Sequence, residues 1–268
     1  MSLRSIAAAV IALTVLTSMY AQRRRTQETF PGDGSEIDIT PENPTEKTEW
    51  LFARLRYPSF RSNNMYWSMR GHWSIDYPKA DRQFSQGVRR LSRVHARSKE
   101  EIVDLDSDEV FNYPWIYAVE AGHWELTDAQ CKKLREYLLR GGFLMTDDFH
   151  GTYEWDIFMM SMKKVFPDRP VVDIPNNDAI FHVIFDLDHR FQVPGTVNYP
   201  FTRTYEYDGY EPEWKGIYDD KGRLMAGICH NMDLGDAWEW ADSPNYPEKF
   251  TSLAYRIGIN YIVYSMTH

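Results

Sequence analysis

The sequence predicts an α/β fold in which a mostly parallel central sheet carries helices on both faces. Two short apolar stretches, 115–119 and 143–146, have the character of buried strands, and each is followed by a stretch of helical periodicity. Short links between strands and helices that alternate in this way require parallel strands and right-handed crossovers. We therefore expect helices to cover both sides of the sheet.

The composition is that of a folded, acidic protein. The chain has 268 residues, and its 9 Trp, 17 Tyr and 14 Phe are too many aromatic residues for a disordered chain. Its 39 acidic residues exceed its 30 basic residues, and the net charge of −9 gives no positive field for a nucleic-acid backbone. We therefore expect no nucleic-acid partner.

The folded region is expected to begin at Glu49. Residues 50–57 indicate a first strand, and 81–96 indicate a helix with Asp81 as its candidate N-cap. Apolar residues fall on one face of this helix, namely Phe84, Val88 and Leu91.

The next helix has the clearest start signal. Thr127 followed by Gln130 has the pattern of a capping box, and Gly141–Gly142 should end the helix. A further helix is expected over 153–166.

The C-terminal part adds a hairpin and a closing helix. Residues 214–228 indicate two strands joined at 219–222, and 250–266 have near-helical spacing of apolar residues. Between the regular elements lies a long, proline-interrupted stretch, 173–210. Loops of that length usually carry function or cover a site.

The N-terminus differs from the rest of the chain. Residues 1–21 combine a basic start with an apolar run, which is typical of a secretory signal peptide, and 22–48 are a flexible linker rich in Pro, Gly, Thr and Glu. Residues 49–268 then form a single α/β domain. The basic run 23–25 instead favours an uncleaved anchor in the inner membrane. Export to the periplasm or the extracellular space is the preferred expectation, with membrane contact only through the N-terminal segment.

Two cysteines, Cys131 and Cys229, allow at most one disulfide in an oxidising compartment. Cys131 falls on the inward face of a helix and Cys229 follows a strand, so two packed thiols are the preferred interpretation.

Acidic and imidazole side chains follow three of the predicted strands. Glu120 and His123 follow the first, Asp147, Asp148 and His150 the second, and Asn231 and Asp233 the third. Ligands of parallel α/β sheets bind beyond the carboxyl ends of the strands. We therefore expect these groups to meet at one edge.

These residues allow two kinds of chemistry. Asp147, Asp148 and His150 are candidate metal ligands, or two carboxylates in unequal surroundings share acid and base roles, with Asp148, His150 and His123 as catalytic residues. The structural alternative is that one aspartate caps the following helix, the other is solvated, and His123 bonds a backbone carbonyl. His182 and the pair Asp188–His189 have the character of a turn with surface histidines.

A second acidic segment combines carboxylates with aromatic rings. Asp233, Trp238 and Glu239 are of the types that recognise sugars, because carboxylates accept bonds from hydroxyls while a flat ring covers the apolar face of the pyranose. Packing of Trp238 in the core is the structural alternative. The ligand-binding set is therefore Glu120, Asp147, Asn231, Asp233, Trp238 and Glu239.

Nucleotide-binding and serine-hydrolase motifs are absent from the sequence. There is no Gly-x-Gly-x-x-Gly, phosphate loop, Gly-x-Ser-x-Gly or His-Glu-x-x-His. No cofactor is evident, and a divalent metal is the alternative.

Several short segments form a recognisable set: 52–57, 76–81, 122–123, 134–138 with 141–144, 147–148 and 258–261. Together they resemble a bacterial family known only as domain of unknown function number 4159, over roughly residue 50 to the C-terminus. The resemblance implies a three-layer, flavodoxin-like sandwich similar to class I glutamine amidotransferases and trehalose-utilisation-type proteins. It implies no activity.

The chain departs from the amidotransferase pattern at the nucleophile. Amidotransferases place a cysteine on a strand-to-helix elbow, whereas the comparable turn here is 147–150 and Cys131 lies on a helix. Glutamine hydrolysis through a thiolate is therefore not expected. Related non-amidotransferase members keep a histidine around this turn, which directs attention to His150.

Three functions remain open at this point. The first is an envelope protein that binds a carbohydrate or peptide in an acidic and aromatic cleft. The second is a metal-assisted hydrolase in which Asp147, Asp148, His150 and His123 hold an ion that activates water. The third is a non-catalytic scaffold that assembles with other envelope proteins.

Overall fold

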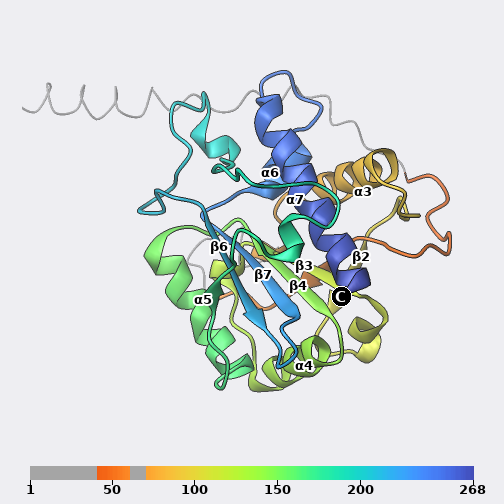
Figure 1. Ribbon diagram of the computed structural model, residues 1–268, viewed down its shortest axis with the longest axis vertical. Helices are drawn as coiled ribbons and strands as arrows, with labels where there is room; N and C mark the ends of the chain where they lie inside the picture. The colour runs from red at the N-terminus through yellow and green to blue at the C-terminus, as the bar shows by residue number, and fades with distance from the viewer. Residues whose placement is uncertain (1–40, 61–70) are drawn as a thin grey trace, which may run out of the picture.

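The computed structural model describes residues 41–60 and 71–268 (Figure 1). The expected signal peptide or anchor, 1–21, and most of the expected linker, 22–48, lie outside these residues. The described part forms a seven-stranded sheet with the order β2-β1-β3-β4-β7-β6-β5.

Most of the sheet is parallel. The parallel strands are β2 (Glu101–Asp104), β1 (Ala53–Arg56), β3 (Trp115–Val119), β4 (Phe143–Asp147) and β7 (Leu224–His230). At one border, β6 (Glu213–Tyr218) runs antiparallel to β7, and β5 (Val172–Asp173) runs antiparallel to β6. The expected α/β class with a mostly parallel sheet is confirmed. Strands β2 and β5 were not expected, because each is short and lacks an apolar run.

Helices pack on both faces of the sheet (Figure 1). Along β3, Trp115 and Tyr117 join one core while Ile116 and Ala118 join another, as the alternation of a strand requires. The first core includes α3 (Lys79–Leu91), α6 (Leu234–Glu239) and α7 (Glu248–Thr267). The second core includes α4 (Asp128–Leu139) and α5 (Gly151–Val165).

Local start signals were partly correct. The capping box of Thr127 and Gln130 is present at α4, and Gly222, with φ 81°, lies in the turn between β6 and β7. The expected cap at Asp81 is wrong, since Pro78 precedes α3 and Asp81 lies within its first turn. The Asp81 carboxylate instead accepts a hydrogen bond from Nε of buried Arg54, at 2.8 Å.

The two cysteines are separated by the sheet. Cys131 lies on α4 in one core, and Cys229 lies within β7 in the other. Both thiols are buried and free, which confirms the packed-thiol interpretation. Burial raises the pKa of both thiols.

The long stretch before β6 lies against the carboxyl ends of β4 and β7. It contains the short 3-10 helices η4 (Ala179–Phe181) and η5 (Thr196–Asn198). The backbone amide of Asp233 donates to the carbonyl of Val193, at 3.0 Å. Asp208 accepts from the amide of Thr152 at the start of α5, at 2.9 Å. This stretch therefore contributes side chains to the edge where the predicted site residues lie.

Candidate functional site

The carboxyl ends of β3, β4 and β7 lie at one edge of the sheet, and the backbone turns sharply after each strand. Glu120, Asp148 and Asn231 have φ values of 51°, 55° and 61°. Left-handed backbone is costly for residues with a side chain, and such strain concentrates at functional sites. Nine carboxylates lie close enough at this edge to interact electrostatically, and we call them the acidic edge: Asp76, Glu120, Asp147, Asp148, Glu154, Glu206, Asp233, Asp236 and Glu239.

His150 is paired with a carboxylate at this edge. Its Nε2 lies 3.3 Å from Oδ1 of Asp148 and 3.9 Å from Oε1 of Glu206. Burial lowers the pKa of His150 to about 4, so the ring is neutral at pH 7. Burial, together with the charge of Glu120, raises the pKa of Asp148 well above its usual range. Burial therefore disfavours the charged form of both groups of this pair.

His123 forms the opposite kind of pair. Its Nε2 lies 3.0 Å from Oε2 of Glu120 and 3.3 Å from Oε1 of Glu154. Burial alone lowers the pKa of His123, but the hydrogen bonds to the two carboxylates outweigh it and raise the pKa to about 10. The ring of His72 stacks on the His123 ring at 4.2 Å. His123 is therefore a cation held between two acids.

Glu154 connects the two imidazoles. Its Oε1 contacts His123, and its Oε2 accepts from the backbone amide of His150 at 2.6 Å. Burial alone would raise the pKa of Glu154, yet these bonds lower it. Glu154 was missed in the sequence because it lies inside α5, where an acidic residue in the first turn has an ordinary helical explanation.

Asp147 faces the start of α6. Its Oδ2 accepts from the amides of Leu234 at 2.7 Å and Gly235 at 3.0 Å, and from the hydroxyl of Tyr117 at 3.1 Å. Its Oδ1 is buried and has no hydrogen-bond partner within the described residues. Burial raises the pKa of Asp147 to about 7 despite these bonds.

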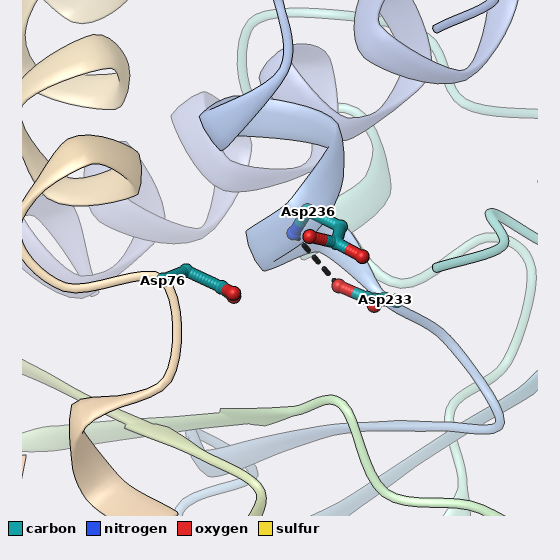
Figure 2. A group of neighbouring side chains, drawn as sticks. All are labelled: Asp76, Asp233 and Asp236. Atoms are coloured by element: carbon teal, nitrogen blue, oxygen red, sulfur yellow. Dashed lines mark hydrogen bonds between the residues drawn. The ribbon is translucent and has the colours of Figure 1, made fainter. Parts of the chain in front are cut away.

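Three carboxylates come together beside α6. Figure 2 shows Asp76, from the segment before α3, pointing toward Asp233 and Asp236. One oxygen of each lies within 4.8 Å of an oxygen of the others. Asp233 caps the helix by accepting from the amide of Asp236 at 2.7 Å. Among the described residues, this is the acidic or imidazole triad close enough to hold a metal ion, in place of the expected Asp147, Asp148 and His150.

Some expected ligand-binding residues have structural roles. Trp238 is fully buried against Phe84, with ring centroids 4.3 Å apart, so its ring cannot cover a sugar. Asn231 accepts from the amide of Gly151 at 2.8 Å and donates to the carbonyl of Glu211 at 2.8 Å. Glu239 lies on α6, and burial and the nearby Asp236 raise its pKa to about 7.

The surface histidine of the long stretch is engaged locally. Nδ1 of His182 lies 3.0 Å from Oδ1 of Asp186, and its Nε2 lies 2.8 Å from the carbonyl of Asn176. This agrees with a turn residue, not with a member of the acidic edge.

Two of the cations near the acidic edge, among the described residues, are engaged with acids outside it. Arg54 binds Asp81, and Nζ of Lys79 lies 3.4 Å from Asp242. The edge therefore favours cations and neutral hydrogen-bonding ligands over phosphates and other anions. Side chains of Glu120, His123 and Glu206 remain 22, 27 and 17% exposed, so a ligand can reach them.

No helix within 41–60 and 71–268 combines the length and apolar character that crossing a bilayer requires.

The comparisons with known proteins identify a family but no activity. A comparison with curated proteins gives no match. A family model matches residues 51–266, and the chain therefore belongs to the family described as Domain of unknown function (DUF4159).

Proposed function

We propose that the protein binds a neutral, polyhydroxylated ligand of the carbohydrate class at the acidic edge. The observation that carries this proposal is the pairing of Asp148 with His150 and of Glu120 and Glu154 with His123 at one edge of the sheet. Carboxyl groups of raised pKa both donate and accept hydrogen bonds, which suits the hydroxyls of a sugar. A peptide ligand is the second class that this edge suits, provided that it is not acidic.

Exposed tyrosines supply the aromatic surface that Trp238 does not. Tyr153 lies in the first turn of α5, and Tyr207 follows Glu206; both rings are 70% exposed. A Cβ built at Gly151 would lie 3.3 Å from Cβ of Tyr207, which places Tyr207 at the start of α5. Two accessible rings beside partly exposed carboxylates support recognition of a pyranose by stacking and hydrogen bonding.

The amidotransferase-like, three-layer fold also belongs to this proposal. It is supported by the turn after β4, where Asp148 has φ 55° between a buried strand and α5. A strained strand-to-helix turn of this kind presents the nucleophile in enzymes with an elbow. Here an aspartate occupies it, and both cysteines are buried elsewhere, which supports a binding protein more than a thiol enzyme.

Export to the cell envelope is part of the same proposal. Its support is the basic start and the apolar run within residues 1–21.

A metal-assisted hydrolase remains the second candidate, and it is favoured by the triad of Asp76, Asp233 and Asp236. An envelope scaffold without a small ligand remains the third.

Binding to an array of neutral oligosaccharides, followed by NMR titration of the hits, tests the proposal. Wild type should bind, while Glu206→Gln and Tyr207→Ala should each weaken binding by about tenfold, or about 1.4 kcal/mol. Glu109→Gln, an exposed carboxylate on η2 (Asp108–Asn112) at the opposite edge, is the matched control. Binding that survives both edge substitutions, or no binding to any neutral glycan, would remove the proposal of a carbohydrate ligand at the acidic edge. Turnover of a hit would instead favour the hydrolase.

A further inference from the structure

We infer that Asp76, Asp233 and Asp236 bind a hard divalent cation. Their carboxylate oxygens lie within 4.8 Å of one another and come from two separate segments, before α3 and at the start of α6 (Figure 2). Sites built only from carboxylate oxygens suit Ca²⁺, Mg²⁺ and Mn²⁺ and lack the nitrogen and sulfur ligands that softer metals prefer. The inference is independent of the proposed carbohydrate ligand.

Buried oxygens without partners point to a missing positive ligand. Oδ2 of Asp76 has no contact with solvent and no hydrogen-bond partner within the described residues, and in Figure 2 this side chain points toward the other two. Oδ1 of Asp147 is likewise unpartnered, and that residue is fully buried. The Asp147 carboxylate lies against the turn that carries the triad, because its Oδ2 binds the amides of Leu234 and Gly235. Unpartnered buried oxygens are costly, and a cation satisfies them.

Two glycines leave the space that the carboxylates occupy. A Cβ at Gly235 would lie 2.4 Å from Oδ2 of Asp76. A Cβ at Gly195 would lie 2.3 Å from Oδ2 of Asp233 and 3.2 Å from Oδ2 of Asp236. Both shorter distances are below any ordinary carbon contact, so a side chain at either position would displace the carboxylate oxygen that lies beside it.

The surrounding charge favours a cation. Besides the three proposed ligands, Glu239 on α6 lies close enough to Asp76 to add its negative charge to the site. Ca²⁺ accepts six to eight oxygen ligands at about 2.3–2.6 Å in flexible geometry, whereas Mg²⁺ demands a near-ideal octahedron at about 2.0–2.1 Å. Three carboxylates within 4.8 Å of one another leave positions for further oxygen ligands, so Ca²⁺, the less demanding ion, is the first probe.

Calorimetric titration of the full chain tests the inference. The protein is treated with EDTA, dialysed and titrated with CaCl₂, MgCl₂ and MnCl₂ up to about 10 mM, because extracellular calcium sites have Kd values of about 10⁻⁴–10⁻³ M. We expect saturable binding of one cation per chain. Asp76→Asn, Asp233→Asn and Gly235→Ala should each weaken it by about tenfold or more. Asp242→Asn makes the same charge change just after α6 and should leave the affinity unchanged.

Two outcomes would overturn the inference: no saturable binding by wild type, or binding by Asp76→Asn with wild-type affinity. Asp233→Asn also alters the cap of α6, so far-UV circular dichroism and Tm in EDTA establish that each variant is folded. Asp76→Asn decides the matter if Asp233→Asn does not fold, since Oδ2 of Asp76 has no hydrogen bond to lose.

Discussion

The two ends of the parallel sheet differ in how their charged side chains are paired and buried. At the amino ends of the strands, acidic side chains meet basic ones near solvent, as in Arg135–Asp168 at 2.6 Å and Arg169–Asp220 at 2.8 Å. At the carboxyl ends, acidic side chains are buried beside one another, and burial raises the pKa of Asp148 and Asp233 well above the usual range. The paired charges at the amino end are compatible with a purely structural role. The buried carboxylates at the carboxyl end destabilise the folded state, and we attribute their presence to function.

The largest effect is expected from the buried cation beneath the acidic edge. Nε of Arg54 donates to Asp81 at 2.8 Å, and Nη1 donates to the carbonyl of Ile75, next to Asp76, at 2.9 Å. Arg54→Met leaves a buried carboxylate without its partner and should lower the free energy of unfolding by about 3–5 kcal/mol in urea denaturation.

Arg56 is the matched control for that change. It lies two residues on in the same strand and binds exposed Asp104, so Arg56→Met should alter stability little. Equal losses in the two variants would contradict the distinction between buried and exposed pairs.

The next effect concerns His123 and depends on pH. Its pKa of about 10 lies above the ordinary value of 6.5, so the folded state holds the proton more tightly. The stability it contributes is therefore complete below pH 6.5 and is lost as the pH rises through about 10. His123→Gln should cost about 3 kcal/mol near neutral pH, and the difference from wild type should shrink toward pH 10 in urea titrations at several pH values.

His182 provides the comparison for this titration. It also pairs with an acid, Asp186, but near the surface, where solvent screens the pair, so His182→Gln should differ from wild type only slightly at any pH. A pH-independent loss in His123→Gln would mean that the ring acts by packing on His72 and not by its charge.

A smaller effect of opposite sign is expected at Asp148. Its raised pKa means that the ionised form opposes folding at neutral pH, and this penalty disappears as the pH falls toward the ordinary 3.8. Asp148→Asn should therefore raise the free energy of unfolding by about 1 kcal/mol at pH 7. Asp219→Asn at the amino end should instead lower it, because Asp219 accepts from the amides of Lys221 and Arg223. Destabilisation by both substitutions would remove the contrast between the two ends.

The sequence predicts which residues follow the strands at the carboxyl end of the sheet, but it does not predict the full set of side chains in the site. Glu120, Asp148, His150 and Asp233 follow strands, and parallel strands bring such residues to one edge, so their approach could be expected. Glu206 could not be expected, because it comes from a stretch without regular structure whose path depends on contacts such as that of Asp208 with Thr152.

The triad shows the same limit in more detail. Asp233 follows a strand and was expected at the edge, but Asp76 reaches it only because Arg54 binds the carbonyls of the preceding residues, Trp73 and Ile75. Trp238 shows the converse error. Its position beside acidic residues suggested a ring that stacks on a sugar, yet the ring is buried in the core. Because α6 has only six residues, its apolar spacing is too short to predict which face of the helix is buried.

The smallest effect is expected from the partly exposed ion pair of Arg135 and Asp168 at the amino end of the sheet. Arg135 and Asp168 form a two-point contact at 2.6 and 2.8 Å, but the side chains are 32 and 50% exposed. Arg135→Met should change Tm by less than about 2 °C, because solvent screens the pair and ordering two side chains costs entropy.

The dependence of Tm on salt is the sharper measurement, since the Debye length is about 8 Å at 0.15 M ionic strength. Added NaCl should weaken the Arg135 pair and erase the effect of Arg135→Met. It should also screen the repulsion among the partly exposed carboxylates of the acidic edge, such as Glu120 and Glu206, and so raise the Tm of wild type. A wild-type Tm that falls with salt would mean that the paired amino end, not the acidic edge, dominates the electrostatics of folding.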